Sequence, residues 1–180
     1  MSATTLPQYI DAQKWADREA VIDQAFPLAA FARVCEGAAS SEGEVRVSIR
    51  VHRDAQGLIV LEGKLSTGVA LICQRCLEPV VTDVNADVQL WLLWNEEAAD
   101  QLPDEADFVL QDAEGRIDLV DVLEDELLLA LPLVAAHEDC QPYQVADVNE
   151  VEVEVAVVET PKRENPFQVL TGLKAGHDKK

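Results

Sequence analysis

The feature that most constrains the fold is the recurrence of an apolar residue at every second position in two segments, 44–52 and 84–94. Successive side chains of a β-strand point to opposite faces of its sheet, so a period of two predicts strands with one buried face and one solvent-exposed face. The residues expected to face the core are Val45, Val47, Ile49 and Val51 in the first segment and Val84, Ala86, Val88, Leu90, Leu92 and Trp94 in the second.

Two further strands are predicted between these segments, which gives an antiparallel β-meander of about four strands. Turn residues at 53–57 precede an apolar segment at 58–65, and Ser-Thr-Gly at 66–68 predicts another turn before a strand at 69–73. The predicted fold class is therefore α+β, with a small twisted sheet or partial barrel.

One long amphipathic helix is predicted over residues 118–131. Asp118 is a suitable N-cap, and Pro132 marks the end of the helix. The first 40 residues predict irregular structure and short helical pieces. The apolar stripe of the long helix is expected to consist of Val120, Leu123, Leu127 and Leu131.

We expect residues 1–160 to form a single globular domain, because the chain is long enough for one sizeable core and its tails. A further alternation at 151–158 predicts an edge strand. Residues 161–180 are expected to form a linker, a short helix and a basic tail. The side of this short helix that could dock on a partner, or on the chain's own sheet, carries Phe167, Leu170 and Leu173.

The net charge of −20 is concentrated in one part of the chain. Residues 1–82 hold 10 acids and 8 bases, whereas residues 83–159 hold 22 acids and a single base. Residues 160–180 hold 2 acids and 5 bases. The middle region would repel a phosphate backbone and attract a basic protein partner. Acidity that only keeps a protein soluble would give the same count, so charge alone does not identify the partner.

The sequence predicts a cytoplasmic protein with reduced thiols. No run reaches the roughly 18 apolar residues that a membrane span needs. The first 15 residues contain neither a basic region nor a continuous apolar stretch of the kind found in secretory signals. The four cysteines are unevenly spread, which is not typical of a disulfide framework.

Cys73 and Cys76 form a C-x-x-C motif for which three interpretations stay open. A redox pair would need a helix N-terminus to lower a thiol pKa, whereas strand-like sequence lies on both sides here. A structural zinc site would need two more ligands, and His137 and Cys140 provide an H-x-x-C pair behind the long helix. Alternatively, the cysteines pack at a strand end and His137 is a solvated loop residue.

Other candidates for chemistry are weaker, and we expect a protein that is not an enzyme. Asp118, Asp121 and Asp125 share one face of the predicted helix and could bind a hard cation, as in a metal-dependent ribonuclease. A solvated helix face explains the same pattern.

A local RNA contact is a further hypothesis. The solvent-exposed face of the strand predicted at 44–52 carries two arginines, and two other basic residues could lie near it. Ordinary surface ion pairs would explain these charges equally well, and no aromatic residues alternate with them. The candidate residues are Arg46, Arg50, Lys64 and Arg75.

Three motifs together resemble the YceD family, the large ribosomal RNA subunit accumulation proteins. They are CQRCLEPV at 73–80, GRIDLVDVLEDELLLALPLV at 115–134 followed by HEDC at 137–140, and NPFQVLTGLK at 165–174. The resemblance extends from about residue 28 onward. Some relatives carry a richer cysteine cluster where this chain has HEDC, so either the metal site is lost here or His137 replaces a thiolate.

The resemblance implies a bacterial cytoplasmic factor needed for synthesis, processing or stability of 23S ribosomal RNA. The family brings no catalytic residues. The implied partners are large-subunit ribosomal RNA precursor or basic large-subunit ribosomal proteins, and the acidic region at 83–159 favours the proteins. A direct RNA-binding module and a metal-dependent ribonuclease are the alternatives.

Overall fold

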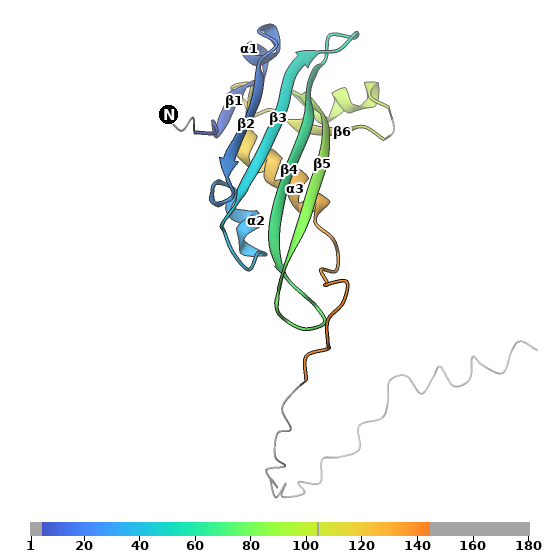
Figure 1. Cartoon of the computed structure of the whole chain (residues 1–180). Helices are drawn as coiled ribbons and strands as arrows, with labels where there is room; N and C mark the ends of the chain where they lie inside the picture. Colours follow the sequence, from blue (N-terminus) through green and yellow to red (C-terminus); the bar gives the residue numbers. More distant parts are fainter. Residues whose placement is uncertain (1–4, 104, 145–180) are drawn as a thin grey trace, which may run out of the picture. The chain divides into compact units, whose positions relative to one another are not determined.

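A five-stranded sheet in the order β2-β3-β4-β5-β6 is the centre of the fold (Figure 1). The computed structural model describes residues 5–103 and 105–144. The strands of this sheet are β2 (Val21–Pro27), β3 (Glu44–Arg53), β4 (Ile59–Ile72), β5 (Pro79–Leu93) and β6 (Asp107–Leu110). A separate two-stranded antiparallel sheet pairs β1 (Tyr9–Asp11) with β7 (Arg116–Asp118). The helical elements are α1 (Ala12–Asp17), η1 (Leu28–Ala30), α2 (Ala32–Glu36), η2 (Glu96–Gln101) and α3 (Leu119–Ala130). The α+β class is confirmed.

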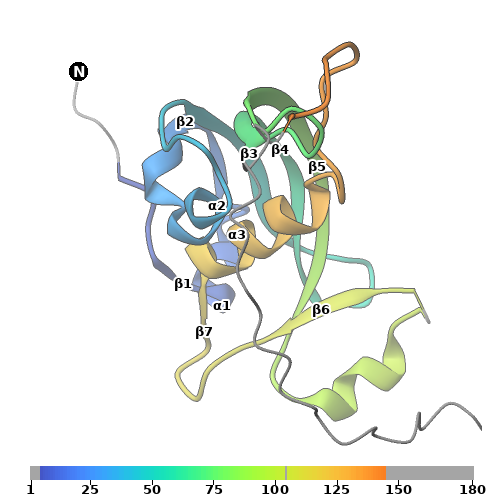
Figure 2. The same ribbon diagram turned by 90° about the horizontal axis from the view of Figure 1, so that it is seen from below.

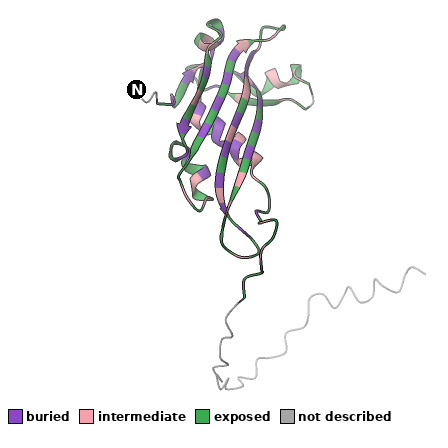
Figure 3. Ribbon diagram, in the orientation of Figure 1, coloured by how far each residue is buried: buried purple, intermediate pink, exposed green. Residues whose placement is uncertain are grey.

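The predicted alternation is confirmed in β3 and in most of β5. Buried and exposed residues alternate along both strands (Figure 3). Trp94 is the exception, because its side chain is 53% exposed. The strand ends one residue earlier, at Leu93, and the chain then enters η2, so the period of two no longer applies.

The turn predicted at 66–68 is wrong, because β4 is one continuous strand through that segment. It pairs with β3 from Ile59 to Thr67 and with β5 from Val60 to Ile72. Ser and Thr fit a pleated strand, and the Thr67 hydroxyl donates to the Glu44 carbonyl oxygen at 3.0 Å. Gly68 does not end the strand, because the ladder with β5 continues through its pairing with Asp83 as far as Ile72.

Two strands were missed in the first 40 residues. β2 pairs antiparallel with β3 along its whole length, and β1 belongs to the small sheet. In β2 only Ile22 and Phe26 are buried, while polar Gln24 lies between them and Val21 is exposed. This interrupted pattern is typical of an edge strand and weakens the period of two.

The sheet is mixed rather than purely antiparallel, because β6 pairs parallel with β5. A parallel neighbour needs a crossover of about a dozen residues or more. The connection between Leu93 at the end of β5 and Asp107 at the start of β6 is long enough, and it includes η2. The sheet is open, with β2 and β6 at its edges.

α3 matches the predicted helix in position but not in length. It has 12 residues, which is ordinary for a globular protein, so the helix is not long. Asp118 caps it as predicted, accepting a hydrogen bond from the Asp121 N–H at 3.1 Å. The buried apolar face is shifted from the predicted one and consists of Leu119, Val122, Leu123 and Leu127.

α2 and α3 pack against each other, and α3 packs on the sheet at β5 (Figure 2). Their apolar residues form one core with the inward residues of β3, β4 and β5. None of the helices within the described ranges is long and apolar enough to cross a membrane. The predicted domain end at 160, the strand at 151–158 and the short helix with Phe167, Leu170 and Leu173 lie outside the described residues.

Candidate metal centre

The C-x-x-C motif forms a tight turn between β4 and β5, which we call the first knuckle (residues 73–78). The Leu77 N–H donates to the Cys73 carbonyl oxygen at 3.0 Å, and the Cys73 N–H donates to the Glu78 carbonyl oxygen at 2.9 Å. Leu77 has a φ of +64°, a left-handed conformation that glycine usually supplies. These two bonds reverse the chain directly after the last residue of β4.

A second segment, the second knuckle (residues 135–140), follows α3 and lies against the first. The Gln74 N–H donates to the Ala135 carbonyl oxygen at 2.9 Å. Just beyond this segment, the Tyr143 N–H donates to the Arg75 carbonyl oxygen at 2.8 Å. Backbone hydrogen bonds within the chain therefore join two segments that are more than 60 residues apart in the sequence, without any contribution from a metal.

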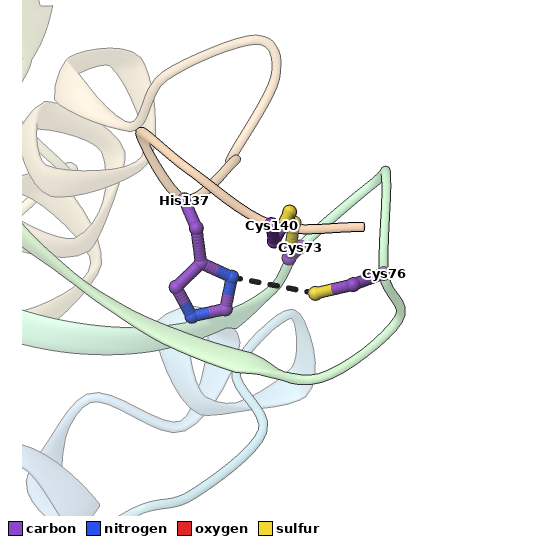
Figure 4. Close-up of side chains that lie close together, drawn as sticks. All are labelled: Cys73, Cys76, His137 and Cys140. Carbon is purple, nitrogen blue, oxygen red and sulfur yellow. Dashed lines mark hydrogen bonds between the residues drawn. The ribbon is translucent and has the colours of Figure 1, made fainter. Parts of the chain in front are cut away.

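The four predicted ligands come together between the two knuckles (Figure 4). The ligand atoms of Cys73, Cys76, His137 and Cys140 all lie within 4.8 Å of one another. The Cys73 and Cys140 sulfurs are 3.8 Å apart, and the Cys76 sulfur is 3.4 Å from His137 Nδ1.

These separations fit a tetrahedral metal site. A zinc ion with bonds of about 2.3 Å to sulfur and 2.0 Å to nitrogen places two thiolates about 3.8 Å apart, and a thiolate and an imidazole nitrogen about 3.5 Å apart. Four protein ligands fill the coordination sphere of zinc, which is the arrangement of structural rather than catalytic sites. The cluster is thus a Cys3His group that could hold a metal such as zinc.

Arg75 connects the two knuckles from inside the C-x-x-C motif. Its Nε donates to the Cys140 sulfur at 2.9 Å, and one of its terminal nitrogens donates to the carbonyl oxygens of His137 at 3.0 Å and Glu138 at 3.3 Å. Its guanidinium also places a positive charge beside the three thiols, and the hydrogen bond to Cys140 raises the pKa of Arg75 above its ordinary value.

The two thiols of the first knuckle have different acidities. Backbone hydrogen bonds, first from the Cys76 N–H and then from the Arg75 N–H, lower the pKa of Cys73 to about 5. For Cys76, a hydrogen bond from the Glu78 N–H lowers the pKa, but desolvation and the neighbouring Cys73 and Cys140 together raise it above its ordinary value. Cys73 is therefore prepared as a thiolate ligand before any metal binds.

The fourth cysteine, Cys35, lies in α2 and outside this cluster. Its sulfur donates to the Leu28 carbonyl oxygen at 3.3 Å, and burial raises its pKa. Within residues 5–103 and 105–144, the two knuckles hold the sole group of three or more such ligands suited to a metal.

The residues predicted to contact RNA divide into two groups. Three lie on β3 and β4, where each forms an ion pair with a neighbouring acid: Arg46 with Asp23, Arg50 with Glu62 and Lys64 with Asp87. The fourth, Arg75, is engaged in the knuckles. The ion pairs match the alternative interpretation of these charges, and the RNA contact stays a prediction.

The acids of the ribonuclease hypothesis have other partners. Asp118 caps α3, whereas Asp121 and Asp125 each form an ion pair with Arg33 of α2, at 2.6 Å and 2.7 Å. These contacts hold α2 against α3.

Sequence reasoning missed two features. One is the bridging position of Arg75, which nothing in its local sequence indicates. The other is an exposed apolar surface on α3, where Leu129 is 81% exposed. The signal for this surface was three consecutive leucines at 127–129, since adjacent helical residues cannot all face one side.

Comparison with known proteins identifies relatives over most of the chain. The family model described as Large ribosomal RNA subunit accumulation protein YceD matches residues 61–174. A curated protein of Haemophilus influenzae with the same description is 32% identical over 176 residues, which are 97% of this chain and 99% of that protein. No solved structure matches the chain.

Proposed function

Because the chain belongs to the YceD family of large ribosomal RNA subunit accumulation proteins, we propose that it is a non-enzymatic ribosome-biogenesis factor of the cytoplasm. It supports the synthesis, processing or stability of 23S ribosomal RNA. The observation that carries this proposal is the similarity to the Haemophilus influenzae protein, which extends over 97% of this chain.

The factor acts mainly through contacts with basic components of the assembling large subunit. Residues 83–159 hold 22 acids and a single base, which attracts basic proteins and repels phosphates. The basic residues on β3 and β4 also favour a protein partner over RNA, because Arg46, Arg50 and Lys64 are each paired with an acid. Ion pairing leaves little free positive charge there for a phosphate backbone.

A structural zinc ion held by the two knuckles would stabilise the described part of the molecule. Cys73, Cys76, His137 and Cys140 would hold it, and it would cross-link the β4–β5 connection to the segment behind α3. We expect about one zinc per chain after purification without chelator. Cys76→Ser should reduce this content severalfold, whereas Cys35→Ser, which removes a thiol outside the cluster, should leave it unchanged. Zinc far below one per chain in the unaltered protein would contradict the site.

Complementation of a deletion strain tests the function. We expect the deletion to lower the ratio of 23S to 16S ribosomal RNA and the intact chain to restore it, measured by quantitative hybridisation on total RNA. An unchanged ratio in the deletion strain would contradict the proposal.

One variant in the same strain tests the non-enzymatic assignment. Asp121→Ala removes an acid that a ribonuclease would need and breaks one ion pair with Arg33. We expect this variant to restore 23S ribosomal RNA, because surface ion pairs contribute only about 0–1 kcal/mol to stability. A folded variant that fails to restore it would favour the ribonuclease instead.

A further inference from the structure

A groove of about 570 Å³ lies between β6 and the second half of α3. Its apolar surface includes Phe108 from β6 and Leu128 and Leu129 from α3. Phe108 is 39% exposed and Leu129 is 81% exposed. β6 is an edge strand, so the groove borders a side of the sheet that other described strands leave open.

The groove also has an acidic rim. Asp107, Asp125 and Glu126 line it, and Arg33 is the one base among its lining residues. The Arg33 guanidinium is held by Asp121 and Asp125. Among the described residues, neither Asp107 nor Glu126 forms an ion pair.

The rim carboxylates affect one another. Burial raises the pKa of Glu126, and the negative charges of Asp107 and Asp125 raise it further. A cationic ligand placed between these groups would relieve this repulsion. Together, the groove offers exposed apolar side chains next to negative charge that is not neutralised by a base.

We propose that this groove binds a basic amphipathic segment of a partner protein. Leucine-type side chains of the partner would fill the apolar floor, and lysine or arginine side chains would meet Asp107 and Glu126. The proposal rests on the proposed function, which calls for basic partners, and it assigns their contact to one surface. A nucleic acid would be repelled by the same rim, and a second copy would bring a second acidic rim to the contact.

Fluorescence anisotropy with the full chain tests the proposal at an ionic strength of about 0.15 M. The probe is a labelled helical peptide of leucine and lysine with leucine on one face. A peptide of lysine, glycine and serine with the same charge controls for non-specific attraction to a chain of net charge −20. We expect the first peptide to bind at least tenfold more tightly than the second.

Matched variants assign the binding to the groove. We expect Leu129→Ser to weaken binding of the leucine–lysine peptide by about tenfold, because an exposed leucine that becomes buried contributes on that scale. Asp107→Asn should weaken it by about threefold to tenfold. The controls are Val81→Ser, which alters an apolar side chain that is 73% exposed elsewhere on β5, and Asp83→Asn; both should change binding less than twofold.

Several results would overturn the proposal. Equal binding of both peptides, or equal effects of groove and control variants, would show attraction to bulk charge alone. A dimer in sedimentation velocity that Leu129→Ser abolishes would assign the groove to a second copy. Tenfold tighter peptide binding after removal of residues 165–180 would assign it to the chain's own end.

The groove and the proposed function can fail separately. If the protein restores 23S ribosomal RNA but does not bind the peptide, the binding site in the groove is rejected and the proposed function stands. If the protein binds the peptide but has no effect on ribosomal RNA, the proposed function is rejected and the binding site stands.

Discussion

The contacts of Arg75 in the structure differ from the role that the sequence predicts for it. In the sequence it is a base near other bases, and it was therefore predicted to contact RNA. In the structure its guanidinium is directed at Cys140 and at two carbonyl oxygens of the second knuckle. No local pattern predicts this, because the contacts depend on how residues 135–140 return to the sheet after α3.

We expect Arg75→Ala to weaken zinc binding by about tenfold while the sheet remains folded. The alanine removes the positive charge beside the thiolates and the bonds that hold the second knuckle, and such outer-shell changes commonly cost about 10–100-fold in metal affinity. Competition with a chromophoric chelator measures the affinity, and circular dichroism checks the fold.

Arg75→Lys and Arg50→Ala are the controls for this prediction. Lysine keeps the charge but not the planar set of donors, so it should recover part of the affinity. Arg50→Ala removes an ion-paired arginine from β3 and should have no effect. Identical affinities for all four proteins would show that Arg75 does not position the ligands.

Glu126 makes stability depend on pH in a defined direction. Burial and two neighbouring carboxylates raise its pKa above the ordinary value of 4.5, so its ionised form is less favourable in the folded chain than in the unfolded one. This cost is absent below pH 4.5, where Glu126 is protonated in both states, and it is complete once the pH exceeds the folded pKa.

Glu126→Gln should therefore raise Tm by roughly 1–3 °C at pH 7 and leave it unchanged near pH 4. Thermal unfolding of both proteins across this range measures the effect. Glu114→Gln, an exposed acid that pairs with Arg116, is the control and should give no increase at pH 7. A Tm increase that is equally large at pH 4 would show that the gain does not come from ionisation.

At the scale of elements, periodicity predicted the strands in which buried and exposed residues alternate regularly. It failed where the pattern is interrupted or where pairing with another strand determines the structure. β3 was predicted within one residue because each inward position is apolar and each outward position is polar or charged. β2 was missed because Gln24 interrupts its pattern, and its pairing with β3 is a tertiary contact. Gly68 was predicted to lie in a turn, although its pairing with Asp83 of β5 holds it in β4.

The two glycines of β4 should respond differently to substitution by alanine. A Cβ at Gly63 would lie 2.6 Å from the Ile49 Cα and would clash with the Ser48 carbonyl oxygen, both in the backbone of β3. A Cβ at Gly68 would meet Val81 Cγ1 at 3.5 Å, which is ordinary contact.

We expect Gly63→Ala to destabilise the fold by about 2–3 kcal/mol, since the backbone of β3 must shift to admit the methyl group. Gly68→Ala should change the free energy of unfolding by less than about 0.5 kcal/mol. Urea denaturation followed by tryptophan fluorescence measures both. Equal destabilisation by the two substitutions would contradict the close approach of β4 to β3 at Gly63.

At the scale of the whole molecule, the sequence allowed the class but not the complete topology to be predicted. The parallel pairing of β6 with β5 depends on where residues 94–106 cross, and nothing in their acidic composition indicates that path. The ligand set was predicted from two short spacings, whereas its assembly required the knuckles to meet, which only the fold determines.

Charge and structure together support one account of how the molecule works. The zinc-type cluster joins two distant segments, and the predicted RNA-contact bases on β3 and β4 are each paired with an acid. Asp107 and Glu126, which form no ion pair among the described residues, line the apolar groove beside α3. These features are the basis of our proposal that the molecule holds basic proteins during assembly.

Sedimentation of the tagged protein from growing cells on a sucrose gradient, with the RNA of each fraction sequenced, tests the role in large-subunit assembly most directly. The account predicts that the protein migrates with fractions that contain 23S ribosomal RNA precursors and not with mature ribosomes. A protein found only at the top of the gradient, even after crosslinking, would contradict it.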